Sequence, residues 1–123
     1  EEFKGVKGQA AVDKLLKEKR GHVKGAFHRD DIGDIDLFWG NDTAGLLHMI
    51  KQREKEKPWH AVEILSLLNT TITNGSFERK NDKGNFEFSY ENDKNKYFAI
   101  IAPEYHKNKL TYVVTAFKRT IKK

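Results

Sequence analysis

The stretch Gly33-Asp-Ile-Asp-Leu-Phe-Trp-Gly40, followed by Asn41-Asp-Thr43 and then by Gly45-Leu-Leu-His-Met-Ile-Lys-Gln-Arg53, decides the fold that this sequence predicts. From residue 34 to residue 39, apolar residues at every second position alternate with aspartates and one phenylalanine, which is the period of a half-buried strand. Asn, Asp or Thr can cap a helix by accepting its first amide hydrogens. A strand, a capping turn and a short helix therefore follow one another directly.

Outward from this stretch, the sequence predicts further helices and strands. Residues 9–20 and 44–55 have helical spacing of their apolar residues, and a helix over 59–73 follows Pro58, with Val62, Leu65, Leu68 and Ile72 on one face. Residues 22–27 are expected to pair with 34–39 as a hairpin. Strands are expected over 75–79, 85–90, 96–102 and 110–117, because turn residues separate these runs. The predicted fold class is α+β, with N-terminal helices packed on an antiparallel β-sheet.

Composition limits the classes of protein that fit. At 123 residues, with 37% hydrophobic residues and no cysteine, the chain is expected to be a single domain, with a lead-in and helix over 1–20 and the rest over 21–123. Missing cysteine excludes disulfides, thiolate metal sites and cysteine nucleophiles. No apolar run reaches the roughly 18–20 residues that a membrane-spanning helix needs. The chain does not begin with Met and is expected to be cut from a longer protein.

Charge is unevenly distributed along the chain. The net charge is +5; residues 107–123 contain six cations and no acid, whereas residues 30–42 contain five aspartates and no cation. A basic end of this kind suggests a polyanionic partner such as nucleic acid, although many basic proteins have none.

One histidine and its neighbours are the first candidate site. His48 lies in the middle of the predicted helix, with Lys51 three residues on and Arg53 close behind. A neutral imidazole near a cation can act as general acid or base, because its ordinary pKa of about 6.5 is close to neutral pH. The competing interpretation is an ordinary, partly buried helix histidine.

The last predicted strand and its basic end are the second candidate. Thr115 and Phe117 share one face, and Lys118 and Arg119 follow them. A hydroxyl, an aromatic ring and cations along one sheet edge can bind a phosphate and stack a base. The same pattern also fits a β-branched strand residue, a core aromatic and a solvated end. His28, beside Arg29 and after the first predicted strand, is the candidate for a second catalytic group.

The hairpin aspartates are a rival site. Asp34 and Asp36 share a face, and Asp30 or Asp31 can complete the ligand shell of a divalent metal. No metal-binding motif supports this, and solvent-facing carboxylates are the favoured interpretation. We therefore expect neither a metal nor another cofactor.

The run from Gly21 to Asn41, with Gly45-Leu-Leu-His48 and the closing Thr115-Ala-Phe117, resembles the phage-type nuclease domains of the barnase/EndoU/colicin/RelE-like (BECR) superfamily. Those domains commonly contain Gly-x-Ile/Asp-Leu-Val-Trp-Gly, then Gly-Leu-x-His-Ile, and close on Thr-x-Tyr or Thr-x-Phe. The resemblance covers about residues 21–119. It implies a BECR-like fold and a metal-independent endoribonuclease, with RNA, expected to be tRNA, as its substrate.

The resemblance also implies roles for single residues. His48 would be the main acid/base residue, Thr115 would bind the scissile phosphate, and Phe117 would support the site or stack on a base. Family members often follow the histidine with a Lys-His pair, whereas this chain has Lys51-Gln-Arg53. Arg53 or Lys51 is thus the candidate phosphate clamp, and Arg53 is the expected catalytic residue of the two. Lys51, Lys118, Arg119 and His28 are expected to bind substrate.

The resemblance further implies a toxin domain of the contact-dependent or polymorphic kind. Such a domain is secreted or delivered as the C-terminal part of a larger protein and acts in the target-cell cytoplasm. A cognate immunity protein, acidic where it covers the cleft, is the expected partner. Two alternatives stay open: a non-catalytic RNA-binding module, and a metal-dependent nuclease that uses the carboxylates between Asp30 and Asp36.

Overall fold

Four helices and one six-stranded sheet form the described part of the molecule. The computed structural model describes residues 1–42, 45–56, 58–105 and 110–121. Along the chain, the elements are α1 (Gln9–Glu18), β1 (His22–Arg29), β2 (Gly33–Phe38), α2 (Gly45–Glu56), α3 (Pro58–Ser66), α4 (Leu68–Asn74), β3 (Ser76–Lys80), β4 (Phe86–Glu91), β5 (Asn95–Tyr105) and β6 (Leu110–Thr120). The α+β class expected from the sequence is confirmed.

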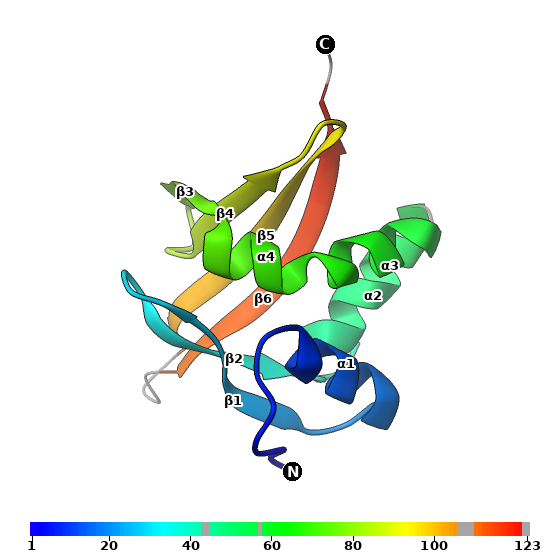
Figure 1. Ribbon diagram of the computed structural model, residues 1–123, viewed down its shortest axis with the longest axis vertical. Helices are drawn as coiled ribbons and strands as arrows, with labels where there is room; N and C mark the ends of the chain where they lie inside the picture. Colours follow the sequence, from blue (N-terminus) through cyan, green and yellow to red (C-terminus); the bar gives the residue numbers. More distant parts are fainter. Residues whose placement is uncertain (43–44, 57, 106–109, 122–123) are drawn as a thin grey trace.

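The sheet has the strand order β1-β2-β6-β5-β4-β3 (Figure 1). The strands β3 to β6 form the expected antiparallel meander, and β1 and β2 form the expected hairpin. The pairing of β2 with β6 is parallel, through Asp36 and Tyr112. The sheet is therefore mixed, which corrects the wholly antiparallel expectation. The sequence pattern cannot reveal this pairing, because the helices α2 to α4 separate the two strands.

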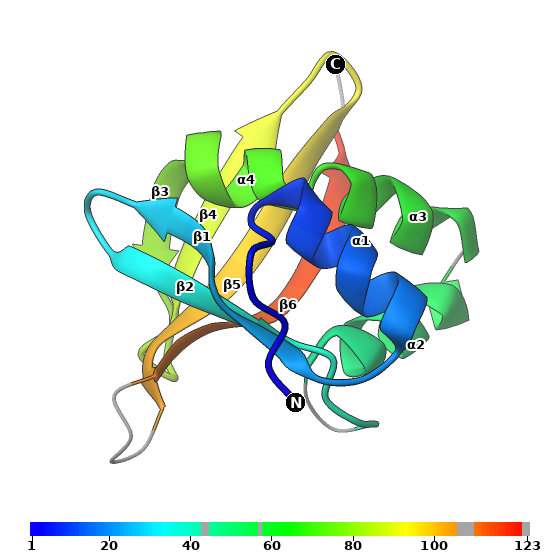
Figure 2. The same ribbon diagram turned by 60° about the horizontal axis from the view of Figure 1, so that its bottom comes forward.

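The helices gather on one side of the sheet. Figure 1 shows α4 crossing the meander, and Figure 2 shows α1 beside the hairpin and α2 and α3 beside β6. One hydrophobic core lies between these helices and the sheet. Its largest fully buried side chains come from helices and strands alike: Tyr97, Phe27, Phe88, Leu15, Ile35, Leu37, Met49, Leu68, Ile72 and Ile101. None of the described helices covers the opposite face of the meander, which is called the open face below.

The helix expected over 59–73 is divided in two. α3 ends at Ser66, and α4 begins at Leu68. Leu67 between them has φ −110° and ψ 8°, outside the helical range, and the Ser66 hydroxyl donates to the Glu63 carbonyl oxygen at 2.7 Å. No proline or glycine marks this break, so the sequence gives no local signal for it.

The division changes which residues of α3 are buried. Val62, expected in the buried stripe, is 71% exposed, while Ala61, Ile64 and Leu65 are buried. The expected stripe, which includes Val62, and the observed stripe of Ala61, Ile64 and Leu65 both have helical spacing. Periodicity alone therefore cannot choose between the two stripes. Packing against the core favours the stripe of Ala61, Ile64 and Leu65.

The hairpin also departs from its expected form at one aspartate. Asp36 is only 8% exposed, and its Oδ1 accepts a hydrogen bond of 2.8 Å from the backbone amide of Gly25. Gly25 has a φ of 61° and lies where the register of β1 shifts between Val23 and Phe27. The expectation of a solvent-facing carboxylate is wrong for Asp36, because this side chain holds the irregular part of β1.

Candidate active site

A glycine pair fixes the start of α2. Gly45 has a φ of 87°, and a Cβ atom there would lie 2.8 Å from the Cα of Gly40 and 2.9 Å from the carbonyl oxygen of Trp39. Only glycine fits so close to a neighbouring backbone. The Trp39 carbonyl also accepts a hydrogen bond of 2.9 Å from the Leu47 amide. The glycines quoted from the sequence thus fix the helix to the end of β2; the cap candidate Thr43 lies outside the described residues.

His48 is half-buried on α2 and has a defined hydrogen bond. Its Nδ1 lies 2.7 Å from the carbonyl oxygen of Asp42. A carbonyl oxygen only accepts, so Nδ1 must be the donor in this bond. In the neutral ring Nε2 is then the nitrogen that accepts a proton. The bond therefore selects the tautomer that a general base needs.

Lys51 holds the same turn from the other side. Its ammonium lies 2.6 Å from Oδ1 of Asp42. This hydrogen bond and its charge lower the pKa of the Asp42 carboxyl, with a smaller contribution from His48. Lys51 and His48 are thus brought together on Asp42, one on its carboxylate and the other on its carbonyl.

Arg53 lies on a different side of the helix. Leu46 and Met49 are buried, and Arg53 continues their stripe with its Nε also buried. Five residues separate Arg53 from His48, which is about 140° around an α-helix. The helix α2 packs against both α3 and β6. Arg53 therefore extends from the side of α2 that faces the core.

The faces of β6 follow from its neighbours. Ala116 is buried on the face that the helices cover, so Thr115 and Phe117 belong to the open face. Within the described part of the chain, the Thr115 hydroxyl oxygen is buried and has no hydrogen-bond partner. Such a group is costly unless a ligand or water completes it. Thr115 is therefore a strong candidate for a substrate contact.

Phe117 forms part of an aromatic and cationic cluster on the open face. It pairs with Phe98 of β5, with ring centroids 4.8 Å apart and an interplanar angle of 14°. The guanidinium of Arg119 lies 5.5 Å from the centroid of each ring. Lys96 lies 5.4 Å from the centroid of Phe98. Half-buried aromatic rings beside cations suit both the bases and the phosphates of RNA.

Lys118 points the other way. β6 runs to Thr120, so this residue belongs to a strand and not to a solvated end. Its ammonium binds the carboxylate of Glu63 on α3, and its side chain is only 10% exposed. The Tyr97 hydroxyl donates to the same carboxylate. Lys118 and then Tyr97 lower the pKa of Glu63. The structure thus separates Lys118 from Thr115, Phe117 and Arg119, and it uses Lys118 to attach α3 to the sheet.

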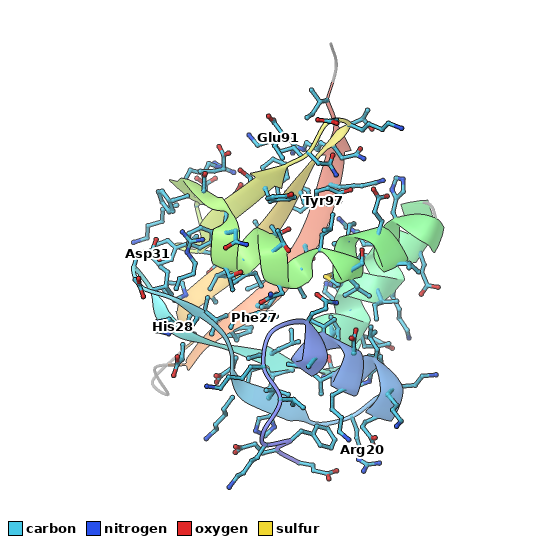
Figure 3. All side chains as sticks on the ribbon, viewed as in Figure 1. Arg20, Phe27, His28, Asp31, Glu91 and Tyr97 are labelled. Carbon is cyan, nitrogen blue, oxygen red and sulfur yellow. The ribbon has the colours of Figure 1, made fainter. Side chains whose placement is uncertain are left out.

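His28 lies apart from these groups. It is 60% exposed on the β1–β2 hairpin, with Nδ1 2.9 Å from Asp34 and Nε2 3.4 Å from Asp30. The hydrogen bond to Asp34 is the main reason why the pKa of His28 is raised above 6.5. Figure 3 places His28 beside Asp31 at the hairpin, across the molecule from α2. The structure does not bring it together with His48.

The rival metal site lacks suitable geometry. Asp36 accepts from the Gly25 amide, Asp34 binds His28, and Asp31 binds Arg29 at 3.0 Å. Among residues 1–42, 45–56, 58–105 and 110–121, no three His, Asp or Glu side chains lie close enough to share a metal ion. Asp31, Asp34 and Asp36 thus bind protein groups.

Sequence reasoning missed Phe98. The alternation of Lys96, Phe98 and Ile100 places these residues on one strand face, but it cannot reveal that Phe98 lies opposite Phe117. That pairing depends on the register of β5 against β6. The hydrogen-bond role of Asp42 was also missed, because only a turn of defined shape places its carbonyl at His48.

A model of one protein family matches residues 26–123, and it is described as "phage-Barnase-EndoU-ColicinE5/D-RelE like nuclease1". The match includes β2, α2 and β6, which carry most of the site described above. No curated protein matches the chain. None of the described helices is long and apolar enough to cross a membrane.

Proposed function

Because this chain belongs to the phage-Barnase-EndoU-ColicinE5/D-RelE like nuclease family, we propose that it is an endoribonuclease that cuts RNA without a metal ion. The observation that carries the proposal is the packing of α2 against β6. It brings the helix of His48 and Arg53 beside the strand of Thr115 and Phe117. An acid/base group and a cation thus come from α2, and a hydroxyl and an aromatic ring come from the open face of the neighbouring β6. The proposal requires that RNA contacts both at the boundary between α2 and β6.

RNA supplies its own nucleophile, the 2′-hydroxyl. In the proposed step, the 2′-oxygen forms a bond to phosphorus while the bond from phosphorus to the 5′-oxygen breaks. The proton of the 2′-hydroxyl passes to Nε2 of neutral His48, and the departing 5′-oxygen takes a proton from water. The products are a 2′,3′-cyclic phosphate and a 5′-hydroxyl.

Two further side chains stabilise the negative charge that develops on the phosphate. The Thr115 hydroxyl, buried without a partner among the described residues, donates to a phosphate oxygen. The Arg53 guanidinium supplies a positive charge. Preorganised donors of this kind contribute several kcal/mol to the transition state because they need no rearrangement during the reaction. Phe117, with Phe98 and Arg119, holds a neighbouring base.

The test is incubation of the protein with total RNA in excess EDTA, followed by mapping of the cut ends. We expect discrete cuts that bear 2′,3′-cyclic phosphates. Cleavage that requires added metal, or ends with free 3′-hydroxyls, would contradict the mechanism. The positions of the cuts also identify the target RNA, which we propose to be tRNA.

A non-catalytic RNA-binding module is the second candidate. The Phe98–Phe117 pair and Arg119 favour it, since a stacking platform beside a cation binds single-stranded RNA without cleaving it. Such a module would bind RNA with a steep dependence on salt and leave the RNA intact. Intact RNA after prolonged incubation with a protein that binds it would favour this candidate.

We also propose a biological setting. The domain acts as a toxin, delivered as the C-terminal part of a larger protein of a contact-dependent or polymorphic system into the target-cell cytoplasm. A nuclease made inside its producer needs an inhibitor, so we propose a cognate immunity protein with an acidic surface. The exposed Arg119 beside Phe117 suits such a surface. Inhibition of cleavage by the product of the adjoining reading frame tests this part.

A further inference from the structure

A row of cross-strand partners runs over the open face from Thr115 to the far edge of the sheet. Thr115 lies opposite Ile100, Ile100 opposite Glu87, and Glu87 opposite Arg79. Side chains of directly opposite residues share a face. The row therefore connects the proposed phosphate-binding residue with Arg79, three strands away, at a spacing of about 4.8 Å for each strand.

A pocket of about 310 Å³ lies at this row. It is lined by residues of β3, of the β3–β4 turn, of β5 and of β6: Arg79, Asn81, Asp82, Lys83, Asn85, Ile100, Val114 and Thr115. Ile100 supplies apolar surface, and so does Val114, because the register of β5 against β6 shifts between Ile100 and Ile101. Arg79 of β3 and Lys83 of the turn supply two cations, and the turn also supplies two carboxamides and the carboxylate of Asp82. A few polar groups around an apolar surface are typical of small-ligand sites.

The cations of the pocket are held by fixed structure. Arg79 binds the Glu87 carboxylate at 3.0 Å, and the Glu87 side chain is only 13% exposed. In the turn, Oδ1 of Asn81 accepts from the amides of Lys83 and Asn85, both at 3.0 Å. Gly84 has a φ of 80°, which closes the turn. The Arg79 guanidinium is therefore held by Glu87, and the backbone that carries Lys83 is fixed by the turn, which lowers the entropy lost when an anion binds.

The polar groups fit the two parts of a nucleotide. A guanidinium and an ammonium bind phosphate oxygens by charge-assisted hydrogen bonds. Asp82 repels a phosphate but can accept from the amino group of a base. The Asn81 carboxamide, whose oxygen is used by the turn, is left with its amide nitrogen as a donor. The apolar surface of Ile100 and Val114 suits the face of a base.

We propose that this pocket binds the nucleotide next to the scissile phosphate, with Arg79 and Lys83 on its outer phosphate and Ile100 and Val114 against its base. The inference rests on the proposed function, because Thr115 is the link between the pocket and the reacting phosphate. It gives the protein a binding site that extends beyond the cut bond toward the β3–β4 turn.

The experiment measures binding without cleavage, in EDTA, with 2′-O-methyl oligonucleotides that lack the nucleophile. A dinucleotide contains only the phosphate that would be cut, whereas a tetranucleotide also contains the outer ones. We expect the double variant Arg79→Ala, Lys83→Ala to lose at least about tenfold in affinity for the tetranucleotide relative to the dinucleotide. The slope of log Kd against log salt should fall by about 0.7 for each cation removed.

Lys80→Ala is the matched control. It removes a neighbouring cation of β3, but Lys80 lies opposite Phe86, which packs against the core and not on the open face. It should leave the ratio of the two affinities unchanged. Since Arg79→Ala also leaves Glu87 without its ion pair, the single variant Lys83→Ala provides an independent measurement. Circular dichroism and thermal melting check that each variant folds.

Each outcome decides between the two proposals. An unchanged ratio in the double variant, or an equal loss for both lengths, overturns the subsite. If Lys80→Ala lowers the affinity for the tetranucleotide relative to the dinucleotide as much as the double variant does, the subsite is overturned as well. If the double variant shows the expected loss but the unaltered protein leaves unmodified RNA of the same sequence intact, the proposed cleavage fails, and the pocket stands as a site that binds a nucleotide of uncleaved RNA.

Discussion

The hairpin and the α2–β6 region each contain a histidine beside an aspartate, but the atoms in contact differ. His28 is exposed and binds carboxylate oxygens of Asp34 and Asp30. His48 is half-buried and binds a backbone carbonyl of Asp42, whose carboxylate binds Lys51 instead. Both pairs look alike in the sequence, where each histidine simply lies near acidic residues.

The type of oxygen decides what each histidine can do. Carboxylates stabilise the protonated ring, so His28 is favoured as a cation with both nitrogens engaged. A single carbonyl engages only Nδ1 of His48 and leaves Nε2 for proton transfer. The buried Thr115 hydroxyl also lies on an element that packs against α2. The α2–β6 region is therefore the proposed reaction site, and the hairpin is not.

The most direct test of the difference between His48 and His28 is to remove each imidazole in turn. His48→Ala should lower the rate of RNA cleavage by roughly 10²–10⁴-fold, because the general base is lost. His28→Ala should change it by less than about threefold. Cleavage assays at neutral pH in EDTA, with circular dichroism as the folding control, measure both. Equal losses in the two variants would contradict the assignment.

Thr115→Val tests the strand side of the site with little change in shape. Removing one preorganised donor should lower the cleavage rate about a hundredfold. The melting temperature should stay the same or rise, because a buried hydroxyl without a described partner is replaced by a methyl group. A variant that loses stability together with activity would indicate a structural role.

Phe98→Leu tests where RNA binds. Loss of a stacking ring should weaken binding of single-stranded RNA roughly tenfold, within the range of about 1–3 kcal/mol for each stacked base. The matched variant is Phe38→Leu on the hairpin, where the ring contacts His22 and Tyr112. It should bind RNA like the unaltered protein. Similar losses would extend the RNA surface to the hairpin.

The smallest effect concerns the titration of His28. Its pKa in the folded protein is raised, so its contribution to stability is present below the ordinary value of 6.5 and is lost as the pH rises through the raised pKa. Asp34→Asn should move the pKa back toward 6.5, since the hydrogen bond to Asp34 is the main cause. NMR titration of the imidazole resonances measures this. An unchanged pKa would show that Asp34 does not hold the ring.

Much of the fold could be predicted where a local sequence pattern was compatible with only one secondary structure. The alternation of residues 34–39 predicted β2, and the capping residues Asn41, Asp42 and Thr43 predicted that a helix follows. The break at Leu67 and the exposure of Val62 could not be predicted, because two helical stripes of equal quality overlap in residues 61–72. Contacts with the rest of the core decided between them.

In the candidate site, too, local sequence indicated some features and tertiary structure decided others. His48, Arg53, Thr115 and Phe117 could be singled out by residue type and spacing, and their roles stay predictions. Lys118 and Arg119, neighbours in the sequence, lie on opposite faces of β6, since the strand continues through them. Sequence alone could not reveal this, because it required knowing where β6 ends.

The sequence by itself determined the periods of its helices and strands, the glycine-bounded entry into α2 and the supply of groups that suit RNA chemistry. These depend on residues close together along the chain. Tertiary structure decided the parallel pairing of β2 with β6, the packing of α2 on β6 and the row from Thr115 to Arg79. Those depend on which buried surfaces fit together, and residues far apart in sequence contribute to that fit jointly.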